Sequence, residues 1–296
     1  MKAGERSMSV KILADSASDL PLSFYKETGV TLFPLGVHLD GQEFEDLLTI
    51  EPATVYKAIR AGHMPKTSQV SPLRFEETFK QMAQNNEEGI YIAFSSALSG
   101  TYQTAVMIRD QVKEEYPEFN LKIVDSKCAS MGVGLVVIEA ARLAAEGASF
   151  AAILEDVKFR CAHMEHLFTV DDLNHLAKGG RLSKASAFMG GLLNIKPLLN
   201  MEDGKLVPIE KHRGQKKLLR RIIEAMKERG KDLDKQVVAI THADSLDLAL
   251  EMKETIKSEL NVVDVKVSDI GAAIGSHTGP GTISFFFLNE VPAKNA

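Results

Sequence analysis

Short apolar runs alternate with longer segments of helical spacing along the first half of the chain. Strands are expected at residues 10–15, 29–39, 89–95 and 121–126, where apolar runs are bounded by polar or glycine residues. Helices are expected at residues 52–62, 71–85, 100–116, 130–147 and 149–164, and Ser99 is the expected cap of the third. This alternation predicts βαβ units and a parallel sheet.

The second half of the chain has a different pattern. Residues 195–211 are expected to form a hairpin that turns at Asp203-Gly204. A strand is expected before the hairpin at 165–170, and the elements expected after it are helices at 215–230 and 245–260 and strands at 235–242, 262–270 and 282–288. Because 296 residues exceed what one core usually organises, we expect two α/β domains, residues 8–164 and 165–296.

Polar side chains follow three predicted strands of the first half. The three segments are residues 13–21, 94–103 and 124–132, and they contain Asp15, Ser16, Ser95, Ser96, Asp125 and Ser126. Ligands of parallel sheets bind beyond the carboxyl ends of the strands, and hydroxyls beside helix N-termini suit an anion. Each segment alone is also what a turn or a helix cap requires, with Asp19 expected near the cap of a helix that starts at Pro21.

Two further segments carry candidate polar groups. Residues 64–72 are expected to form a loop that holds Thr67, Ser68 and Gln69. Residues 274–281 are expected to form a Gly/Pro loop that holds His277, where the backbone can approach a ligand closely.

Composition limits the class of protein. The formal net charge of −5 gives no reason to expect a nucleic-acid surface, and the basic run 211–221 is typical of a solvated helix face. No apolar run reaches the roughly 18 residues of a membrane helix, and the start of the chain lacks an apolar signal core. The two cysteines, Cys128 and Cys161, have neither disulfide-framework nor metal-site spacing, so we expect a cytoplasmic protein without a metal.

Nucleophilic catalysis has little support in the sequence. There is no G-x-S-x-G motif, no Walker A loop and no G-x-G-x-x-G after the first strand. His277 could act as a base for a serine, but no residue is marked as its acid partner. A hydrolase or phosphotransferase that uses the Ser/Thr/His groups stays open as the alternative to a binding protein.

Six ordered segments resemble the signature blocks of the DegV family. They are "ILADSASDLP", "KTSQVSP", "SSALSGTYQTA", "IVDSKCASMGVG", "LNHLAKGGRLSKASAFMGGLLNIKPLL" and "IGSHTGPG", from Ile12 to Gly281. The resemblance implies an N-terminal parallel-sheet α/β domain and a C-terminal α/β domain with a ligand between them. It further implies a long-chain fatty acid in an internal tunnel, no cofactor, and a separate kinase that converts the presented carboxylate to an acyl phosphate.

The resemblance also implies roles for individual residues. The carboxylate would be held by Thr67, by Ser95 or Ser96, and by His277, and Ser96 is the preferred serine because it follows the strand end. Supporting or pocket-lining residues would be Ser16, Ser68, Ser126, Gly190 and Gly279. Arg181, Lys196 and Arg213 would contact the kinase or phosphate.

The sequence departs from the family pattern after residue 281. Phe285, Phe286 and Phe287 stand where small residues are usual, so we expect the tunnel to be reshaped there. The expected partners are therefore a long-chain fatty acid and a kinase, with no nucleic acid, no membrane span, and at most transient contact with a membrane surface.

Overall fold

The computed structural model describes residues 10–183 and 195–292. The first half of the chain builds a parallel four-stranded sheet of order β2-β1-β6-β7. Its strands are β1 (Lys11–Asp15), β2 (Thr31–Phe33), β6 (Gly89–Ala93) and β7 (Leu121–Asp125). The parallel βαβ arrangement predicted from the sequence is confirmed.

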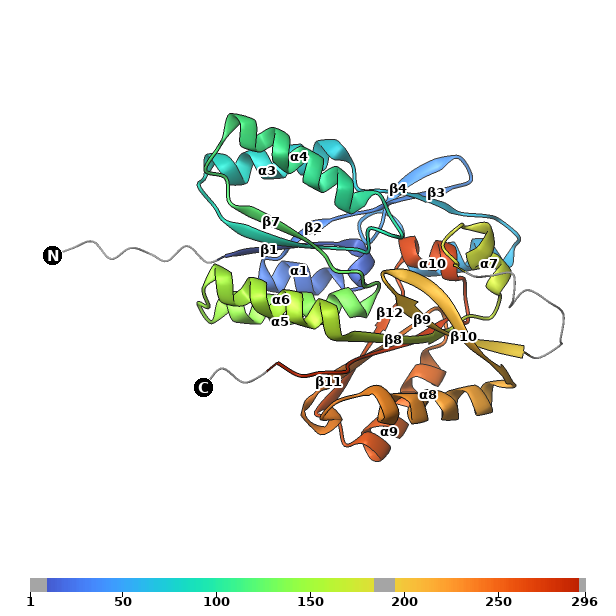
Figure 1. The fold of residues 1–296 in the computed structure, drawn as a ribbon. Coiled ribbons are helices and arrows are strands. Elements are labelled where there is room, and N and C mark those ends of the chain that lie inside the picture. The colour runs from blue at the N-terminus through green and yellow to red at the C-terminus, as the bar shows by residue number, and fades with distance from the viewer. Residues whose placement is uncertain (1–9, 184–194, 293–296) are drawn as a thin grey trace.

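Helices cover both faces of this sheet (Figure 1). Strand β6 is buried along its whole length, because its successive side chains enter opposite cores. In β6, Tyr91 packs with Phe75 and Phe79 of α3, whereas Ile90 and Ile92 pack in the core that includes α5. The helices on one face are α3 (Pro72–Gln84) and α4 (Thr101–Glu115), and those on the other are α1 (Leu22–Thr28), α5 (Met131–Ala145) and α6 (Phe150–His163).

The second half of the chain forms a mixed six-stranded sheet of order β10-β9-β8-β13-β11-β12. Its strands are β8 (Met164–Thr169), β9 (Ile195–Glu202), β10 (Lys205–Arg213), β11 (Val237–His242), β12 (Asp264–Asp269) and β13 (Ile283–Leu288). Strand β13 lies antiparallel between β8 and β11. The chain enters this sheet at Met164, and the predicted domain limits of 8–164 and 165–296 stay a prediction.

The two faces of this second sheet pack differently. Phe285 and Phe287 of β13 pack against α8 (Gln215–Arg229) and α9 (Leu246–Leu260). Phe286 faces the opposite way and packs in the core that includes α5 of the first half. Of the three phenylalanines expected to reshape a tunnel, therefore, only Phe286 faces the first domain.

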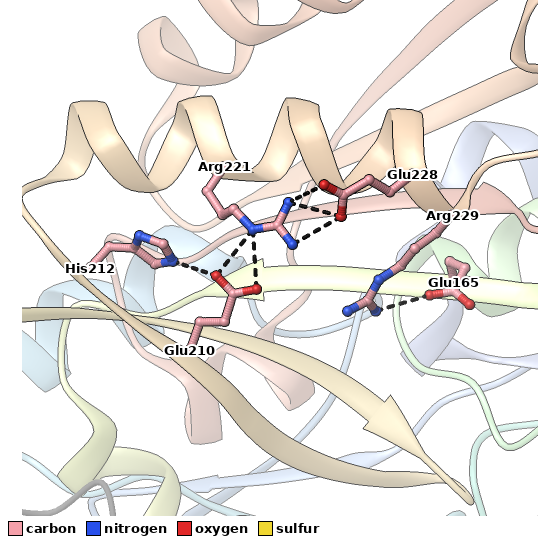
Figure 2. A network of polar contacts seen from close by, with 6 residues as sticks. All are labelled: Glu165, Glu210, His212, Arg221, Glu228 and Arg229. Carbon is pink, nitrogen blue, oxygen red and sulfur yellow. Dashed lines mark hydrogen bonds and ion pairs between the residues drawn. The ribbon is translucent and has the colours of Figure 1, made fainter.

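A charged network fixes α8 on the sheet (Figure 2). The Arg221 guanidinium contacts both carboxylate oxygens of Glu210 on β10, at 3.1 Å each. It also contacts Glu228, two turns further along α8, at 3.0 Å. His212 Nε2 lies 2.7 Å from Glu210, and Arg229 at the end of α8 contacts Glu165 of β8 at 3.3 Å. The network joins the helix to an edge strand and to a central strand.

A small third sheet of order β4-β3-β5 was not expected. It comprises β3 (Gly36–Leu39), β4 (Gln42–Glu45) and β5 (Lys66–Ser68), and α2 (Pro52–Arg60) connects the last two strands. The single strand expected at 29–39 is divided at Pro34-Leu35, because proline cannot donate to a ladder. The segment expected as a loop around Thr67 is strand β5, paired with β3.

Two short helices were not predicted, and the second replaces an expected loop. They are α7 (Leu173–Lys178) and α10 (Ala272–Thr278), so His277 lies in the last turn of a helix rather than on a Gly/Pro loop. Two short 3-10 turns, η1 (Ser16–Ser18) and η3 (Leu233–Lys235), complete the order of elements. Among the described residues, no helix combines the length and the apolar character needed to cross a bilayer.

Asp15, at the end of β1, joins two strands of the first sheet. Its Oδ2 atom accepts hydrogen bonds of 2.8 Å from the Tyr91 hydroxyl and from the Phe94 N–H. The side chain is fully buried, and Oδ1 has no partner among the described residues. Burial outweighs these two hydrogen bonds and raises the pKa of Asp15 to about 6.

The hairpin of β9 and β10 reaches from the second sheet back to the first. Its turn is at Asp203-Gly204, as predicted, with φ values of 49° and 78°. The Gly204 carbonyl accepts a 2.7 Å hydrogen bond from the buried Ser95 hydroxyl. A Cβ atom on Gly204 would collide with that hydroxyl.

We expect Gly204→Ala to destabilise the protein by about 1 kcal/mol more than Gly147→Ala. Both glycines have similar φ values of 78° and 80°, but a Cβ at Gly147 would meet nothing within 4 Å. Urea denaturation measures the difference. In a Ser95→Ala background the two substitutions should cost the same, and an undiminished difference there would contradict the hydroxyl contact.

Asp15→Asn should change how stability depends on pH. In the wild type the folded carboxyl holds a proton between its ordinary pKa of 3.8 and about 6, whereas the unfolded one does not. The wild type therefore loses stability as pH rises through this window, on the order of 3 kcal/mol for about two pH units. Asparagine loses no proton, so its free energy of unfolding should rise relative to the wild type from pH 4 to 6.5. Parallel curves would refute the raised pKa.

Candidate functional site

A cavity of about 270 Å³ lies between the carboxyl ends of the first sheet and the inner face of the second. Both halves of the chain supply its apolar walls. Leu35, Phe94 and Leu98 follow strands of the first sheet, and Phe168, Met201 and Leu206 come from β8, β9 and β10. The cavity is therefore an apolar space at the edge where the sequence predicted a ligand.

Polar groups gather at one end of this cavity. Thr67 of β5 and His277 of α10 both line it, and Thr67 Oγ1 lies 2.7 Å from His277 Nε2. The structure thus joins two of the residues predicted to bind a carboxylate, although 210 positions separate them in the chain. Gly179 packs so closely on the other side of the ring that a Cβ there would lie 2.6 Å from His277 Nδ1.

His277 is neutral at physiological pH. Its burial, together with the positive charge of Arg181 and the neighbouring His175, lowers the pKa of the imidazole to about 4. Arg181 also lines the cavity, and its guanidinium donates to the Gly179 carbonyl at 2.5 Å and to the Leu98 carbonyl at 3.4 Å. This end of the cavity therefore combines a hydroxyl, a neutral imidazole and a guanidinium.

The N-terminus of α4 lies at the same end. Ser99, Gly100 and Gln69 line the cavity, and Gly100 is the N-cap of the helix. The prediction of Ser99 as the cap is wrong by one residue, since its hydroxyl accepts from the Thr101 N–H at 3.3 Å as a local turn contact. The side chain of Ser99 is thereby placed on the cavity wall, beside the positive end of a 15-residue helix dipole.

The inner face of the second sheet forms another part of the cavity wall. His166 donates from Nδ1 to the Met164 carbonyl at 3.2 Å, and its Nε2 accepts from the Ala129 N–H at 3.3 Å, which fixes the neutral tautomer. Burial lowers the pKa of His166 to about 4. The ring of Phe286 meets His166 edge-on at a centroid distance of 5.3 Å. Phe286 thus forms part of the cavity wall, whereas its two neighbours do not.

The serines expected to bind the carboxylate lie elsewhere. Ser95 donates to the Gly204 carbonyl. Ser96 donates to the Asp125 carboxylate at 2.6 Å and does not line the cavity. Ser126 is buried and accepts from the Cys128 N–H at 3.1 Å. The three hydroxyls are thus bound by the turn of the β9–β10 hairpin, by the end of β7 and by the loop that follows β7.

Of the residues expected to support the site, some line the cavity and others do not. Ser68 lines the cavity next to Thr67 and hydrogen-bonds His38 at 3.1 Å. Ser16 is behind the wall, where its hydroxyl accepts from the Leu35 N–H at 3.1 Å. Gly279 ends α10 with a φ of 75° and lies beside the His175 ring. Gly190 lies outside the described residues.

Two of the cations predicted to meet a partner are outside the cavity. Lys196 forms a 2.6 Å ion pair with Asp171, and Arg213 is exposed at the end of β10. The register of the hairpin pairs Lys196 with His212 and Ile195 with Arg213. Because successive side chains of a strand alternate, Lys196 and Arg213 project from opposite faces of the hairpin. Arg181 is separate from them on the cavity wall.

Several cavity residues were not predicted from the sequence. His166 and Ser284 lie on apolar strands, where alternation marks an inner face but not the presence of a cavity. Gln69 and Ser99 stand within recognised segments, and their nearness to a predicted helix start was the available signal. Among the residues that the structure describes, no group of three or more His, Cys, Asp or Glu side chains is arranged to hold a metal ion.

Comparison with known proteins gives consistent matches along the chain. A family model described as "Uncharacterised protein, DegV family" matches residues 9–290. A DegV domain-containing protein of Clostridium perfringens is 39% identical over 282 residues, which cover 94% of this chain and 97% of the relative.

Solved structures agree with this match. A Thermus thermophilus protein, described as a fatty-acid-binding DegV family protein, superposes with a TM-score of 0.87 at 33% identity, covering 94% of this chain and 99% of the other. The Bacillus subtilis fatty acid binding protein DegV gives 0.83 at 27% identity, covering 94% and 98%. The predicted two-domain α/β fold is confirmed by these structures.

Proposed function

Because the chain belongs to the DegV family, we propose that it binds one long-chain fatty acid in the cavity between its two sheets. The observation that carries the proposal is the cavity itself, which has apolar walls and one polar end. Proteins of this family from Thermus thermophilus and Bacillus subtilis are described as binding fatty acids, at 33% and 27% identity to this chain.

The apolar walls supply the affinity for the acyl chain. Each methylene that moves from water into such a cavity contributes roughly 0.8 kcal/mol, so ten buried methylenes contribute about 8 kcal/mol before the cost of association. Side chains from both halves of the chain, among them Leu98, Met201 and Phe286, would contact the acyl chain. Phe286, as a bulky group on the cavity wall, would limit the length or the shape of the acyl chain.

The polar end supplies the carboxylate site. A buried carboxylate must be hydrogen-bonded, since leaving it unpaired costs several kcal/mol. Thr67 and His277 are in contact there, and Ser99 and the start of α4 lie beside them. The assignment of Ser95 or Ser96 as a direct ligand stays a prediction, which would require a hydroxyl to leave its present acceptor.

Presentation to a kinase is the second part of the proposal. In this reading the protein is a carrier without catalysis of its own, and a separate kinase converts the bound acid to an acyl phosphate. Lys196 on β9 and Arg213 on β10 would supply positive charge outside the cavity for that partner, and Arg181 would supply it on the cavity wall. Two cysteines without a disulfide favour a cytoplasmic location.

The rival function is hydrolysis through the Thr67–His277 pair. A hydroxyl 2.7 Å from an imidazole is the contact that a nucleophile and its base require. A triad also needs a group that orients the base, and within the described residues no carboxylate is hydrogen-bonded to His277. The carrier function therefore fits the geometry better.

Native mass spectrometry of the purified protein, followed by solvent extraction, tests the proposal. A stoichiometric long-chain fatty acid, converted to its acyl phosphate when kinase and ATP are added, is the expected result. A protein that carries no lipid and takes up no added fatty acid would refute the carrier function. Hydrolysis of an added ester that disappears in Thr67→Val would favour the rival.

Thr67→Val should lower fatty-acid affinity about tenfold, because it removes one hydrogen bond to a charged group at nearly constant volume. Thr255→Val is the matched control, since its exposed hydroxyl donates to the Glu251 carbonyl on α9. Displacement of a fluorescent fatty acid measures both. Equal affinities for the two variants would remove Thr67 from the carboxylate site.

Ser96→Ala completes the set. A loss comparable to that of Thr67→Val would support Ser96 as a direct ligand, whereas unchanged affinity would assign its hydroxyl to Asp125 alone.

A further inference from the structure

The aspartates of the first sequence segment do not line the cavity. Asp19 follows η1, and its carboxylate does not cap the next helix, α1, whose N-cap is Pro21. It is fully buried at the back of α10, together with Asp46 from the segment after β4. The other face of α10 supplies Ala273, Ile274 and His277 to the cavity.

The two carboxylates hold the start of α10. Asp19 Oδ1 accepts from the Gly271 N–H and Asp46 Oδ1 accepts from the Ala272 N–H, each at 2.9 Å. Gly271 fits between them, because a Cβ there would lie 2.9 Å from Asp19 Oδ1 and 3.4 Å from both oxygens of Asp46. The first two N–H groups of the helix segment are thus bound by two parts of the first domain.

The rest of α10 is held just as closely. Ser130, at the start of α5, donates to the second oxygen of Asp19, and Gly275 packs against the Tyr56 ring. At the other end of the helix, His175 donates to the Ser276 carbonyl at 2.8 Å and His277 contacts Thr67 at 2.7 Å. Only six residues, about 9 Å of helix, separate Gly271 from His277.

A short helix transmits a displacement of its start to its end. Interiors are close-packed, so a helix this short moves as a unit when one end is released. Any shift of the Gly271 end would therefore change the contact between His277 and Thr67.

Stability alone does not account for two buried acids. Neither Asp19 nor Asp46 forms an ion pair among the described residues, and one oxygen of Asp46 has no partner there. Burial raises the pKa of Asp46 to about 6 and that of Asp19 well above its ordinary value. An apolar contact would avoid this cost, but it would give no directed acceptor for an N–H group.

We propose that Asp19 and Asp46 are positioning residues for the carboxylate site, which fix the start of α10 and thereby hold His277 against Thr67. The proposal rests on the proposed function for its ligand, a long-chain carboxylic acid. What α10 requires from residue 46 is an acceptor oxygen, so asparagine should replace the aspartate and alanine should not.

The first experiment compares palmitic acid with 1-hexadecanol in Asp46→Ala, Asp46→Asn and wild type, by displacement of a fluorescent fatty acid. Asp46→Ala should lower the affinity for the acid about tenfold and the affinity for the alcohol much less, because the alcohol does not use a carboxylate site. Asp46→Asn should stay within about twofold of the wild type for both. Asp110→Ala, an exposed aspartate on α4, is the control for loss of a carboxylate.

Two outcomes would overturn the proposal. Equal losses for acid and alcohol would show general damage to the cavity, and wild-type affinities for both ligands in Asp46→Ala would show that α10 does not depend on this contact. Should Asp46→Ala not fold, Gly271→Ala replaces it, since its Cβ presses on both carboxylates and should also lower the acid affinity selectively.

A second measurement needs no ligand. The pKa of His277 is about 4 because the ring is buried beside Arg181 and His175. Its titration, followed by NMR in the empty protein, should move towards 6.5 in Asp46→Ala and stay near 4 in Asp46→Asn. Identical titrations in all three proteins would refute positioning. If the wild type bound no fatty acid, the proposed function would fail while this test still decided the role of Asp46.

Discussion

The architecture depends on three carboxylates that are buried with neutral partners. Asp15, Asp19 and Asp46 are each at most 2% exposed, and each is bound by N–H or O–H donors from a different part of the chain. Burying a carboxylate without hydrogen bonds costs free energy, so each of these donors must lie within hydrogen-bond distance in the folded protein. The three acids therefore tie β1 to β6, the first domain to α10, and η1 to the start of α5.

The cavity is a consequence of how the two sheets meet. Two sheets meet with the carboxyl ends of one against the face of the other, and such an edge-to-face meeting leaves a space that side chains only partly fill. One end of the cavity combines the Thr67 hydroxyl with the neutral imidazole of His277.

Most elements of the two large sheets could be predicted from the sequence, because their strands and helices have strong periodicity. The β3–β4–β5 sheet and α10 could not, since their segments are short and rich in glycine, and only tertiary contacts define them. Thr67 and His277 were candidates because each lies in a short polar segment that contains glycine or proline, and their role in binding stays a prediction. Ser96 and Ser99 both follow β6, and the sequence does not show that Asp125 is the acceptor for the Ser96 hydroxyl or that Ser99 lines the cavity. A serine beside a strand end can face a ligand or a neighbouring loop, and only the loop's path distinguishes the two.

Strand β13 is the last strand in the sequence and yet lies in the middle of its sheet, between β8 and β11. It also supplies Ser284 and Phe286 to the cavity wall. During synthesis, therefore, the second sheet stays divided into two incomplete parts until residues 283–288 have left the ribosome. The sheet and the cavity wall are therefore completed at the same time, and a chain that stops before this strand lacks both the joined sheet and this part of the wall.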